Sequence, residues 1–403
     1  MSTSAIKVEE ALIRLLAGAL PLSPESIAIE DAQDRILAED TFAKRTQPPF
    51  TASAMDGYAV RSQDVIQPGA KLTIIGEVAA GYTLDKFVGE NETVRIFTGA
   101  PVPEGADAIL IQEDANVLDE TTIEANVTVA PNSYLRPAGL DFCDGDLLLS
   151  KGQVLDAGAL CLAASGNHDF LPVHAKPKIG ILATGDELRP PGSELEPGQI
   201  IASNSYGVAA IIRSHGGIPV DLGIARDTRD SLQNALKCAI EQNCDGLITL
   251  GGASVGEHDL VRKVFIDVGM ALDFWKILMR PGKPLMFGQL DGMRILGLPG
   301  NPVSSLVCSH LFVAPLVAAL GGRKHQMERK SAILSHSVPP NGAREQYARA
   351  VVSHRDGDVY VDVFENQDSS IVSLYAKANA LVMRPIGATA AKAGETVEYI
   401  PIS

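Results

Sequence analysis

The sequence predicts a multidomain α/β plus β protein, in which a central, doubly wound, mostly parallel sheet is flanked by small β-rich domains. Between residues 177 and 326, short β-branched runs alternate with segments of helical periodicity. Such alternation is typical of strand–helix–strand units and therefore of a parallel sheet. On either side of this segment, short strand-like runs are separated by Gly and Pro turns instead. The 403 residues leave room for several such domains.

The first domain is expected to be helical and mixed, built from residues 1–45 and 141–176. Apolar residues recur at helical spacing from Val8 to Ala19, and Pro21 ends the pattern. A second helix is expected at Ala157–Ser165. The intervening residues 46–140 predict a β-rich domain. Its expected strands are Lys71–Val78, Thr93–Phe97, Ala108–Gln112 and Thr122–Val129.

Residues 177–326 show the clearest periodicity and predict the α/β domain. The expected strands are Lys178–Ala183, Ile218–Ile224, Gly246–Leu250, Asp273–Met279, Leu285–Gln289 and Arg294–Gly297. The expected helices are Ser203–Ser214, Ser231–Gln242, Asp259–Gly269 and a last one that runs to Leu320. Residues 327–403 return to short strands, which favours a small β-barrel or sandwich. Its expected strands are Tyr347–Val352, Val359–Val363, Ala380–Arg384 and Thr396–Ile400.

Composition and charge narrow the classes of function. Lys and Arg number 34 against 49 Asp and Glu, a formal net charge of −15, which disfavours nucleic acid and anionic membranes as partners. Five scattered cysteines without a C-x-x-C pair disfavour a disulfide framework or a thiolate zinc site. The N-terminus lacks the order of a signal peptide, and the run Leu311–Leu320 contains Pro315 and is short for a bilayer. We expect a cytoplasmic protein.

Polar loops follow the expected strands of the α/β domain, and ligands of open α/β sheets bind beyond the carboxyl ends of the strands. Five such loops are predicted at one edge: 184–187, 227–228, 251–259, 280–283 and 299–302. They carry the carboxylates Asp186, Glu187, Asp227, Glu257 and Asp259 and, on or near them, the cations Lys276, Arg280 and Lys283. This co-location, rather than any single loop, indicates a site.

Two of these loops are rich in glycine and enter helices, at 251–256 and 298–305, so that backbone N–H groups can face a phosphate. Ser304 and Ser305 would offer hydroxyls in the first turn. Carboxylates beside phosphates suit Mg²⁺, so the pattern predicts metal-assisted transfer from, or attack at, a phosphate or other oxyanion. Taken singly, each motif has a plainer explanation: a simple strand-to-helix turn, a tight Pro-Gly turn, or helix capping by Asp227.

A second group of motifs lies in the β-rich domain. Ser53–Ala59 and Phe97–Asp107 have no period, and physical grounds alone favour turns and buried strand ends. Arg136 and Asp141, on either side of Gly139, favour a structural salt bridge.

Together these motifs carry a resemblance. The chain resembles the molybdopterin molybdenumtransferases, bacterial enzymes similar to the C-terminal domain of gephyrin, whose four-domain layout accounts for the remaining residues. The matching blocks follow in order: Ser53–Ala59, Phe97–Asp107, Arg136-x-x-Gly-x-Asp141, Ala183–Leu188, Gly251–Asp259, Pro281–Pro284 and Leu298–Val303. Seven blocks in sequence are specific, although none would be specific alone.

The resemblance implies that molybdate is inserted into adenylylated molybdopterin, with Mg²⁺-dependent cleavage of the adenylate and release of AMP, to give molybdenum cofactor. By matching position, Glu187, Asp227 and Asp259 would bind Mg²⁺ and act in catalysis, with Asp186 as a further catalytic candidate. The substrate-binding candidates are Gly251, Gly252, Ser254, Lys276, Arg280, Lys283, Pro299, Gly300, Asn301, Pro302 and Ser304.

Further residues are implied outside the α/β domain. Asp56 and Thr98 resemble residues that the β-rich domain contributes to the site of the other subunit, so a homodimer is implied. Arg349 and Ser369 or Ser370 resemble the residues proposed to hold molybdate. Molybdopterin adenylyltransferase and molybdoenzyme assembly proteins are the expected protein partners.

Some positions depart from the family pattern, and two other functions stay open. Thr51 stands where an acidic residue is common, Leu140 replaces a frequent Glu, and Arg280 stands where Lys is also found. A molybdopterin adenylyltransferase shares the α/β domain but typically lacks the flanking β domains. A non-catalytic dimeric scaffold for cofactor assembly is the other alternative.

Overall fold

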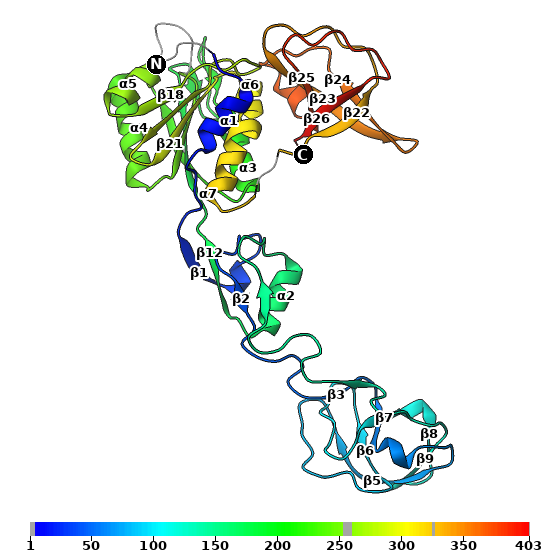
Figure 1. The fold of residues 1–403 in the computed structure, drawn as a ribbon. Helices are drawn as coiled ribbons and strands as arrows, with labels where there is room; N and C mark the ends of the chain where they lie inside the picture. Colours follow the sequence, from blue (N-terminus) through cyan, green and yellow to red (C-terminus); the bar gives the residue numbers. More distant parts are fainter. Residues whose placement is uncertain (1–4, 253–259, 325–326, 403) are drawn as a thin grey trace. The chain divides into compact units, whose positions relative to one another are not determined.

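The computed structural model describes residues 5–252, 260–324 and 327–402. The chain falls into two compact units (Figure 1), and each is described by itself. Unit 1 comprises Met1–Glu25, Asp34–Ala38 and Pro172–Ser403, and unit 2 comprises Ser26–Gln33 and Glu39–Leu171. Strands β1 (Pro24–Ala28) and β12 (Phe170–His174) lie where the chain passes from one unit to the other.

Unit 2 is built around a six-stranded sheet in the order β7-β4-β6-β5-β9-β8. Its strands are β4 (Gly57–Val60), β5 (Lys71–Val78), β6 (Glu92–Ile96), β7 (Ala108–Ile111), β8 (Ala115–Val117) and β9 (Thr122–Ala125). Only β5 and β6 pair in parallel within this sheet. Unit 2 also contains two short strand pairs: β2 (Thr41–Phe42) with β11 (Leu147–Leu149), and β3 (Ala52–Ser53) with β10 (Leu135–Arg136). Its helical elements are α2 (Ala157–Ser165) and the 3₁₀ turns η1 (Ile29–Asp31), η2 (Ser62–Asp64) and η3 (Gln112–Asp114).

Strand β4 was not predicted, and its burial explains why. All four of its residues are buried. Tyr58 and Val60 face one apolar cluster of the unit while Ala59 faces another. A strand that is covered on both faces shows no alternation of apolar and polar residues, so the periodicity that located β5 could not locate β4.

The centre of unit 1 is a six-stranded sheet in the order β16-β13-β17-β21-β20-β18. It comprises β13 (Lys178–Thr184), β16 (Ile218–Ala225), β17 (Gly246–Leu250), β18 (Ala271–Phe274), β20 (Met286–Leu290) and β21 (Met293–Leu298). The strands β16, β13, β17 and β21 are parallel to one another, and β20 runs antiparallel to both β21 and β18. The predicted mostly parallel sheet is therefore confirmed.

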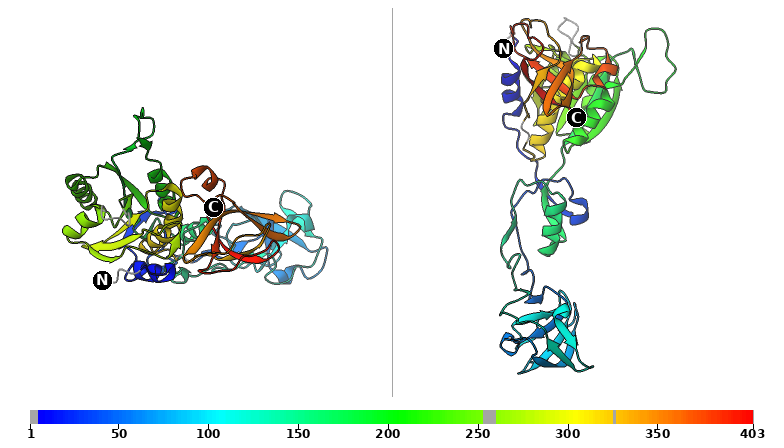
Figure 2. Two further views of the ribbon diagram at one scale, coloured as in Figure 1. Left: turned by 90° about the horizontal axis from the view of Figure 1, so that it is seen from above. Right: turned by 90° about the vertical axis from the view of Figure 1, so that its right-hand side faces the viewer.

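Helices cover both faces of this sheet (Figure 1), as a doubly wound sheet requires. One apolar cluster joins the sheet to α1 (Val8–Leu16), α3 (Asn204–Ser214), α6 (Pro302–Cys308) and α7 (Ala314–Leu320). The other joins it to α4 (Arg229–Glu241) and α5 (Leu260–Asp267). Short strands β14 (Leu188–Arg189) and β15 (Ile200–Ile201) pair with each other, and the loop between them extends away from the sheet (Figure 2).

The helix after β21 runs to Leu320, as the sequence predicted. It continues from α6 through a π-helical turn, η4 (Ser309–Val313), into α7. Among the described residues, Pro302–Leu320 is the one helix long and apolar enough to cross a membrane, at 19 residues and a mean hydropathy of 2.0. However, 89% of that window is buried inside the protein, because it packs against the sheet.

The expected strand Asp273–Met279 is wrong in its length. The chain leaves the central sheet after Phe274 because the next backbone groups pair elsewhere: Ile6 N–H donates to the carbonyl of Lys276 and Leu278 N–H to the carbonyl of Ile6. Met279–Arg280 then forms β19, which pairs with the last domain. No local period could reveal a partner about 270 residues away in the chain.

The C-terminal residues of unit 1 form a closed barrel. Its strands are β22 (Lys330–Leu334), β23 (Glu345–Arg355), β24 (Asp358–Val363), β25 (Ala380–Arg384) and β26 (Thr396–Pro401), with the short helix α8 (Val372–Tyr375). The order β23-β24-β22-β26-β25 is closed by a further pairing of β25 with β23. Closure leaves no free strand edge, and a separate apolar cluster fills the interior.

Arg294 is expected to fix α1 onto the sheet. Its side chain is buried, and its two terminal nitrogens donate to the carbonyls of Leu15 (2.5 Å) and Ala17 (2.8 Å), which the end of the helix leaves without partners. We predict that Arg294→Met exposes α1 to faster amide hydrogen exchange, because unpaired buried carbonyls cost about 1–3 kcal/mol. The matched control is Arg14→Met on the exposed face of α1, which should change exchange little. Equal effects of both changes would contradict this role.

Candidate functional site

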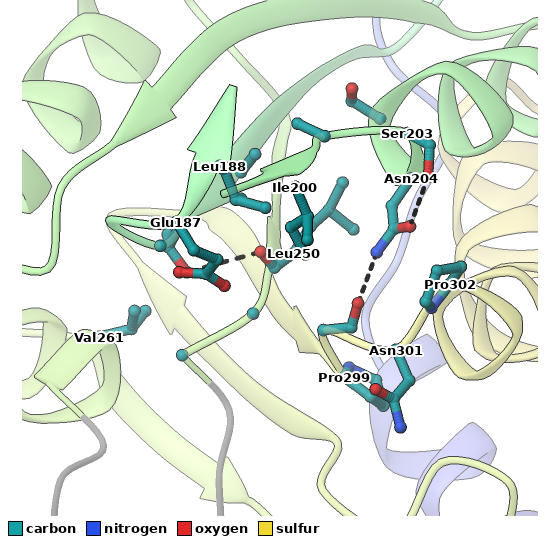
Figure 3. A pocket seen from close by; sticks show the side chains of 18 of the residues that line it. Glu187, Leu188, Ile200, Ser203, Asn204, Leu250, Val261, Pro299, Asn301 and Pro302 are labelled. Atoms are coloured by element: carbon teal, nitrogen blue, oxygen red, sulfur yellow. Dashed lines mark hydrogen bonds between the residues drawn. The ribbon is translucent and has the colours of Figure 1, made fainter. Parts of the chain in front are cut away.

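A cavity of about 1110 Å³ lies in unit 1, at the carboxyl ends of the parallel strands. Strand β13 has β16 on one side and β17 on the other, so the order of strands reverses there, and ligands of such sheets bind at this point. Thr184 at the end of β13 and Leu250 at the end of β17 both line the cavity. Figure 3 shows its wall, with Glu187, Asn204 and Pro299 around one space.

One end of the cavity is acidic. Glu187 follows β13 and Asp227 follows β16, and both line the cavity. The backbone N–H of Asp227 lies 3.3 Å from Oδ1 of Asp186. Burial, with the nearby charges of Asp186 and Glu187, raises the pKa of Asp227. Carboxylates that repel one another in this way attract a cation.

Helix capping does not account for Asp227. The N-cap of α4 is Thr228, whose hydroxyl oxygen accepts from the N–H of Ser231 at 3.3 Å. The side chain of Asp227 is therefore not required to begin the helix, which removes the plainer explanation of this residue.

The acidic end fits Mg²⁺ in its chemistry. Mg²⁺ takes one or two carboxylates and completes its shell with water and substrate phosphates, and Glu187 and Asp227 provide two carboxylates on one wall. In the described parts of the chain no three His, Cys, Asp or Glu side chains are grouped to hold a metal by themselves. Asp259, the third expected ligand, lies outside the described residues, as does Ser254.

Gly251 and Gly252 allow the chain to turn close to β13. Their φ angles are +100° and +66°. A Cβ at Gly251 would lie 2.8 Å from the carbonyl oxygen of Thr184, and one at Gly252 would lie 2.2 Å from Cγ2 of Val261. Both glycines line the cavity, so its floor is backbone that no larger residue could form.

The other end of the cavity is polar (Figure 3). Asn204 at the start of α3 donates through Nδ2 to the carbonyl of Gly300 at 2.7 Å, which joins α3 to the loop Pro299–Pro302 (Figure 3). Ser304 is 4% exposed and also lines the cavity. Ser305 does not: its hydroxyl, expected to be available, donates to the carbonyl of Pro299.

Several polar lining residues were not predicted, among them Ser203, Asn204 and Lys263. Ser203 and Asn204 follow β15 instead of a strand of the central sheet, so a rule based on strand ends does not find them. Lys263 lies inside α5. The Ser-Asn pair at a helix start was the one available signal.

The three expected cations do not line this cavity. Lys276 Nζ is 3.8 Å from the ring centroid of Trp275, and the guanidinium of Arg262 is 4.1 Å from the same centroid. Arg280 lines a second cavity, of about 630 Å³, together with residues 339–342 and 365–368. Lys283 is exposed. The structure thus brings the carboxylates, but not these cations, to the wall of the first cavity.

The last domain reaches the first cavity through one loop. Nδ2 of Asn301 donates to Oγ of Ser369 at 2.9 Å, and Val303 N–H donates to the carbonyl of Ser369 at 3.1 Å. Ser370 lines the cavity. Arg349 is 1% exposed, and its terminal nitrogens donate to backbone carbonyls of the same loop.

In unit 2, Asp56 and Thr98 form an exposed pair. The N–H and the hydroxyl of Thr98 each donate to Oδ1 of Asp56 at 2.7 Å. These bonds, with the charge of Arg95, lower the pKa of Asp56. The pair is an ordered, ionised carboxylate on the surface of its own unit.

Three family models match the chain: the MoeA N-terminal region (domain I and II) at residues 6–166, a probable molybdopterin binding domain at 180–319, and the MoeA C-terminal region (domain IV) at 331–402. The molybdopterin molybdenumtransferase of Haemophilus influenzae is 35% identical over 386 residues, 95% of each chain. That of Bacillus subtilis is 33% identical over 98% of this chain and 94% of its own. The crystal structure of a molybdopterin biosynthesis MoeA protein from Pyrococcus horikosii covers 99% of both chains at 30% identity, with a TM-score of 0.85.

The turn at Gly252 gives a prediction for this site. We expect Gly252→Ala to displace the turn and to reduce activity at least tenfold, because the added methyl would overlap Val261. Gly223→Ala is the matched control: its φ is +77°, but nothing lies within 4 Å of an added Cβ. Both changes impose backbone strain of about 1–2 kcal/mol, so an equal loss of activity from both would show that strain, and not the cavity floor, is responsible. Thermal unfolding and turnover of both variants check this.

Proposed function

Because the chain belongs to the molybdopterin molybdenumtransferase family, we propose that it inserts molybdate into adenylylated molybdopterin, with Mg²⁺-dependent cleavage of the adenylate and release of AMP. The transferase role in molybdenum cofactor biosynthesis is that of the family. The observation that carries the finer proposal is the cavity with two unlike ends. An adenylylated pterin carries an anionic pyrophosphate between two aromatic ring systems, so the acidic end, with a bound cation, would face the pyrophosphate and the polar end would face one of the rings.

The acidic end suits the phosphate part of this substrate. Mg²⁺, when bound, would neutralise the pyrophosphate and polarise its P–O bonds. Glu187 and Asp227 would hold the ion, and the backbone at Gly251 and Gly252 would let the phosphates approach closely. Lys263 also lines this cavity and carries a positive charge.

The polar end suits an aromatic ring system with hydrogen-bonding edges. Ser203, Asn204 and Ser304 provide donors and acceptors, while Ile200 and Pro302 provide apolar wall. The role of these side chains is to orient the substrate, since preorganised donors stabilise charge without moving.

Molybdate would enter as the second substrate beside the loop Pro299–Pro302. That loop meets Ser369 of the last domain, and Arg280 lies in the neighbouring cavity. The protein is proposed to hold the oxyanion and the dithiolene near each other, and the bond-making belongs to the substrates themselves.

A homodimer is part of the proposal. Asp56 and Thr98 are exposed and ordered on unit 2, which suits residues that serve the site of a second copy. The cytoplasmic location and the docking of molybdopterin adenylyltransferase and molybdoenzyme assembly proteins follow from the family resemblance.

The central experiment incubates the purified chain with adenylylated molybdopterin, molybdate and Mg²⁺, and follows AMP and molybdenum cofactor. We expect both products at equal yield without consumption of ATP. A requirement for ATP, with synthesis of the adenylate from molybdopterin, would indicate an adenylyltransferase instead. An absence of both reactions would contradict the proposed function.

Asp227→Asn separates metal binding from folding. Removing one of the crowded carboxylates should raise the thermal stability of the metal-free protein, because the charge of Asp227 is disfavoured in the fold. The same change should abolish the stabilisation by Mg²⁺ with AMP and lower AMP release at least a hundredfold. Asp230→Asn, an exposed carboxylate in the first turn of α4, is the control. Undiminished AMP release by Asp227→Asn would remove this residue from the mechanism.

A further inference from the structure

One loop of the last domain forms wall for both cavities. Residues 364–371, here the shared loop, join β24 to α8. Ser370 lines the first cavity, and Glu365, Asn366, Gln367 and Asp368 line the second, beside Arg280. The position of this loop therefore sets the width of both spaces.

Beyond Phe364, whose N–H donates to the carbonyl of Arg349 at 3.1 Å, side-chain bonds attach the shared loop to β23. The buried guanidinium of Arg349 donates to the carbonyls of Asn366 (3.3 Å), Asp368 (2.9 Å) and Ile371 (3.1 Å). These are backbone acceptors distributed over six residues of the loop, so one side chain fixes its path. Because both terminal nitrogens are occupied in this way, Arg349 acts on the cavities through the loop.

Gln367 completes the attachment from the loop side. Its Oε1 accepts from the N–H of Arg349 at 3.0 Å, and its Nε2 donates to the carbonyls of Arg349 (3.0 Å) and Phe364 (2.8 Å). The carboxamide of Gln367 thus accepts from the N–H of Arg349 and donates to its carbonyl, which are the two bonds that a neighbouring strand would make to a residue of β23. Gln367 thus fixes the loop in one register against the barrel.

The far side of the shared loop meets the α/β domain. The carbonyl of Ser369 accepts from Val303 N–H, and its hydroxyl accepts from Asn301. Within the loop, Asp368 accepts from the N–H and the hydroxyl of Ser370, at 2.8 Å and 2.7 Å. A connected series of bonds therefore runs from β23 through Gln367 and Arg349 to the loop Pro299–Pro302.

We propose that Gln367 is a positioning residue for the oxyanion substrate: its carboxamide holds the shared loop in the register that places Ser370 at the first cavity and residues 365–368 at the second. The proposal rests on the proposed function, since it concerns the same reaction. It assigns Gln367 no contact with a reacting atom. Without the carboxamide, the N–H of Arg349 and the carbonyl of Phe364 lose this partner, the carbonyl of Arg349 keeps the N–H of Phe364, and the loop gains freedom that binding must remove.

The test compares Gln367→Leu with Asn379→Leu. Asn379 makes the same kind of attachment to β23, accepting from Val352 N–H at 2.7 Å and donating to its carbonyl at 3.0 Å, but it lies outside the shared loop. Both changes replace a partly buried carboxamide by an apolar side chain on the same barrel. We expect Gln367→Leu to raise the KM for molybdate at least tenfold with kcat at saturating molybdate changed less than threefold. Asn379→Leu should leave the KM unchanged.

Hydrogen exchange supplies a readout that does not require turnover. Gln367→Leu should accelerate exchange of the amides of Val303 and Ser370, whereas Asn379→Leu should not. Gln367→Glu keeps an acceptor for Arg349 N–H but turns a carboxylate oxygen toward the two carbonyls, so it should accelerate exchange of the same amides, and it replaces the Leu variant if that fails to fold.

The outcomes are distinct from those of the proposed function. If the wild-type chain releases no AMP from adenylylated molybdopterin, the proposed function fails, whereas the exchange experiment still decides the role of Gln367. Unchanged exchange at Val303 and Ser370 in Gln367→Leu would overturn the positioning role. So would an equal KM in Gln367→Leu and wild type, or an equal rise in Gln367→Leu and Asn379→Leu.

Discussion

The close approach of two strand ends is the constraint on which the site depends. Strands β13 and β17 pair in parallel up to Ala183 and Leu250, and the chain must then turn away within two residues. It can do so only because Gly251 and Gly252 carry no Cβ against Thr184 and Val261. That turn leaves open the space at the reversal of strand order, which is where an open α/β sheet binds its ligands.

The electrostatics of the site follow from this geometry. Strands that end side by side bring Glu187 and Asp227 to one wall, and partial desolvation together with the charges of Asp186 and Glu187 raises the pKa of Asp227. In a chain with a formal net charge of −15, such crowding is not relieved by the general surface. A divalent cation bound together with an anionic substrate would neutralise the charges of Glu187 and Asp227. The repulsion between these carboxylates is thereby connected to the chemistry of the family.

How far the sequence could predict this structure depended on the range of the interaction involved. The bounds of β5, β17, β25 and α2 agree with the sequence prediction because the composition and length of each segment are local signals. Strand β4 has only four residues and is buried on both faces, so it shows neither a long apolar run nor an alternation, and the end of β18 escaped because Ile6 takes the next backbone groups. Among the site residues, the rule that ligands bind at strand ends correctly predicted that Glu187, Asp227, Gly251 and Gly252 line one cavity. The same rule could not predict where the side chains of Lys276 and Arg280 lie, because Lys276 contacts Trp275 and Arg280 lies beside the last domain.

Arg349 shows why a residue carried over from a resemblance still needs its environment to be described. An arginine in a predicted oxyanion site suggests a direct charge contact. Here the side chain is 1% exposed, and its terminal nitrogens donate to three backbone carbonyls. A guanidinium is suited to this task, since its planar fork reaches several acceptors at once, whereas an ammonium is a point donor. Its positive charge still lies behind the wall that an oxyanion would meet, so the same residue can order the loop and bias the electrostatic potential of both cavities without touching a ligand.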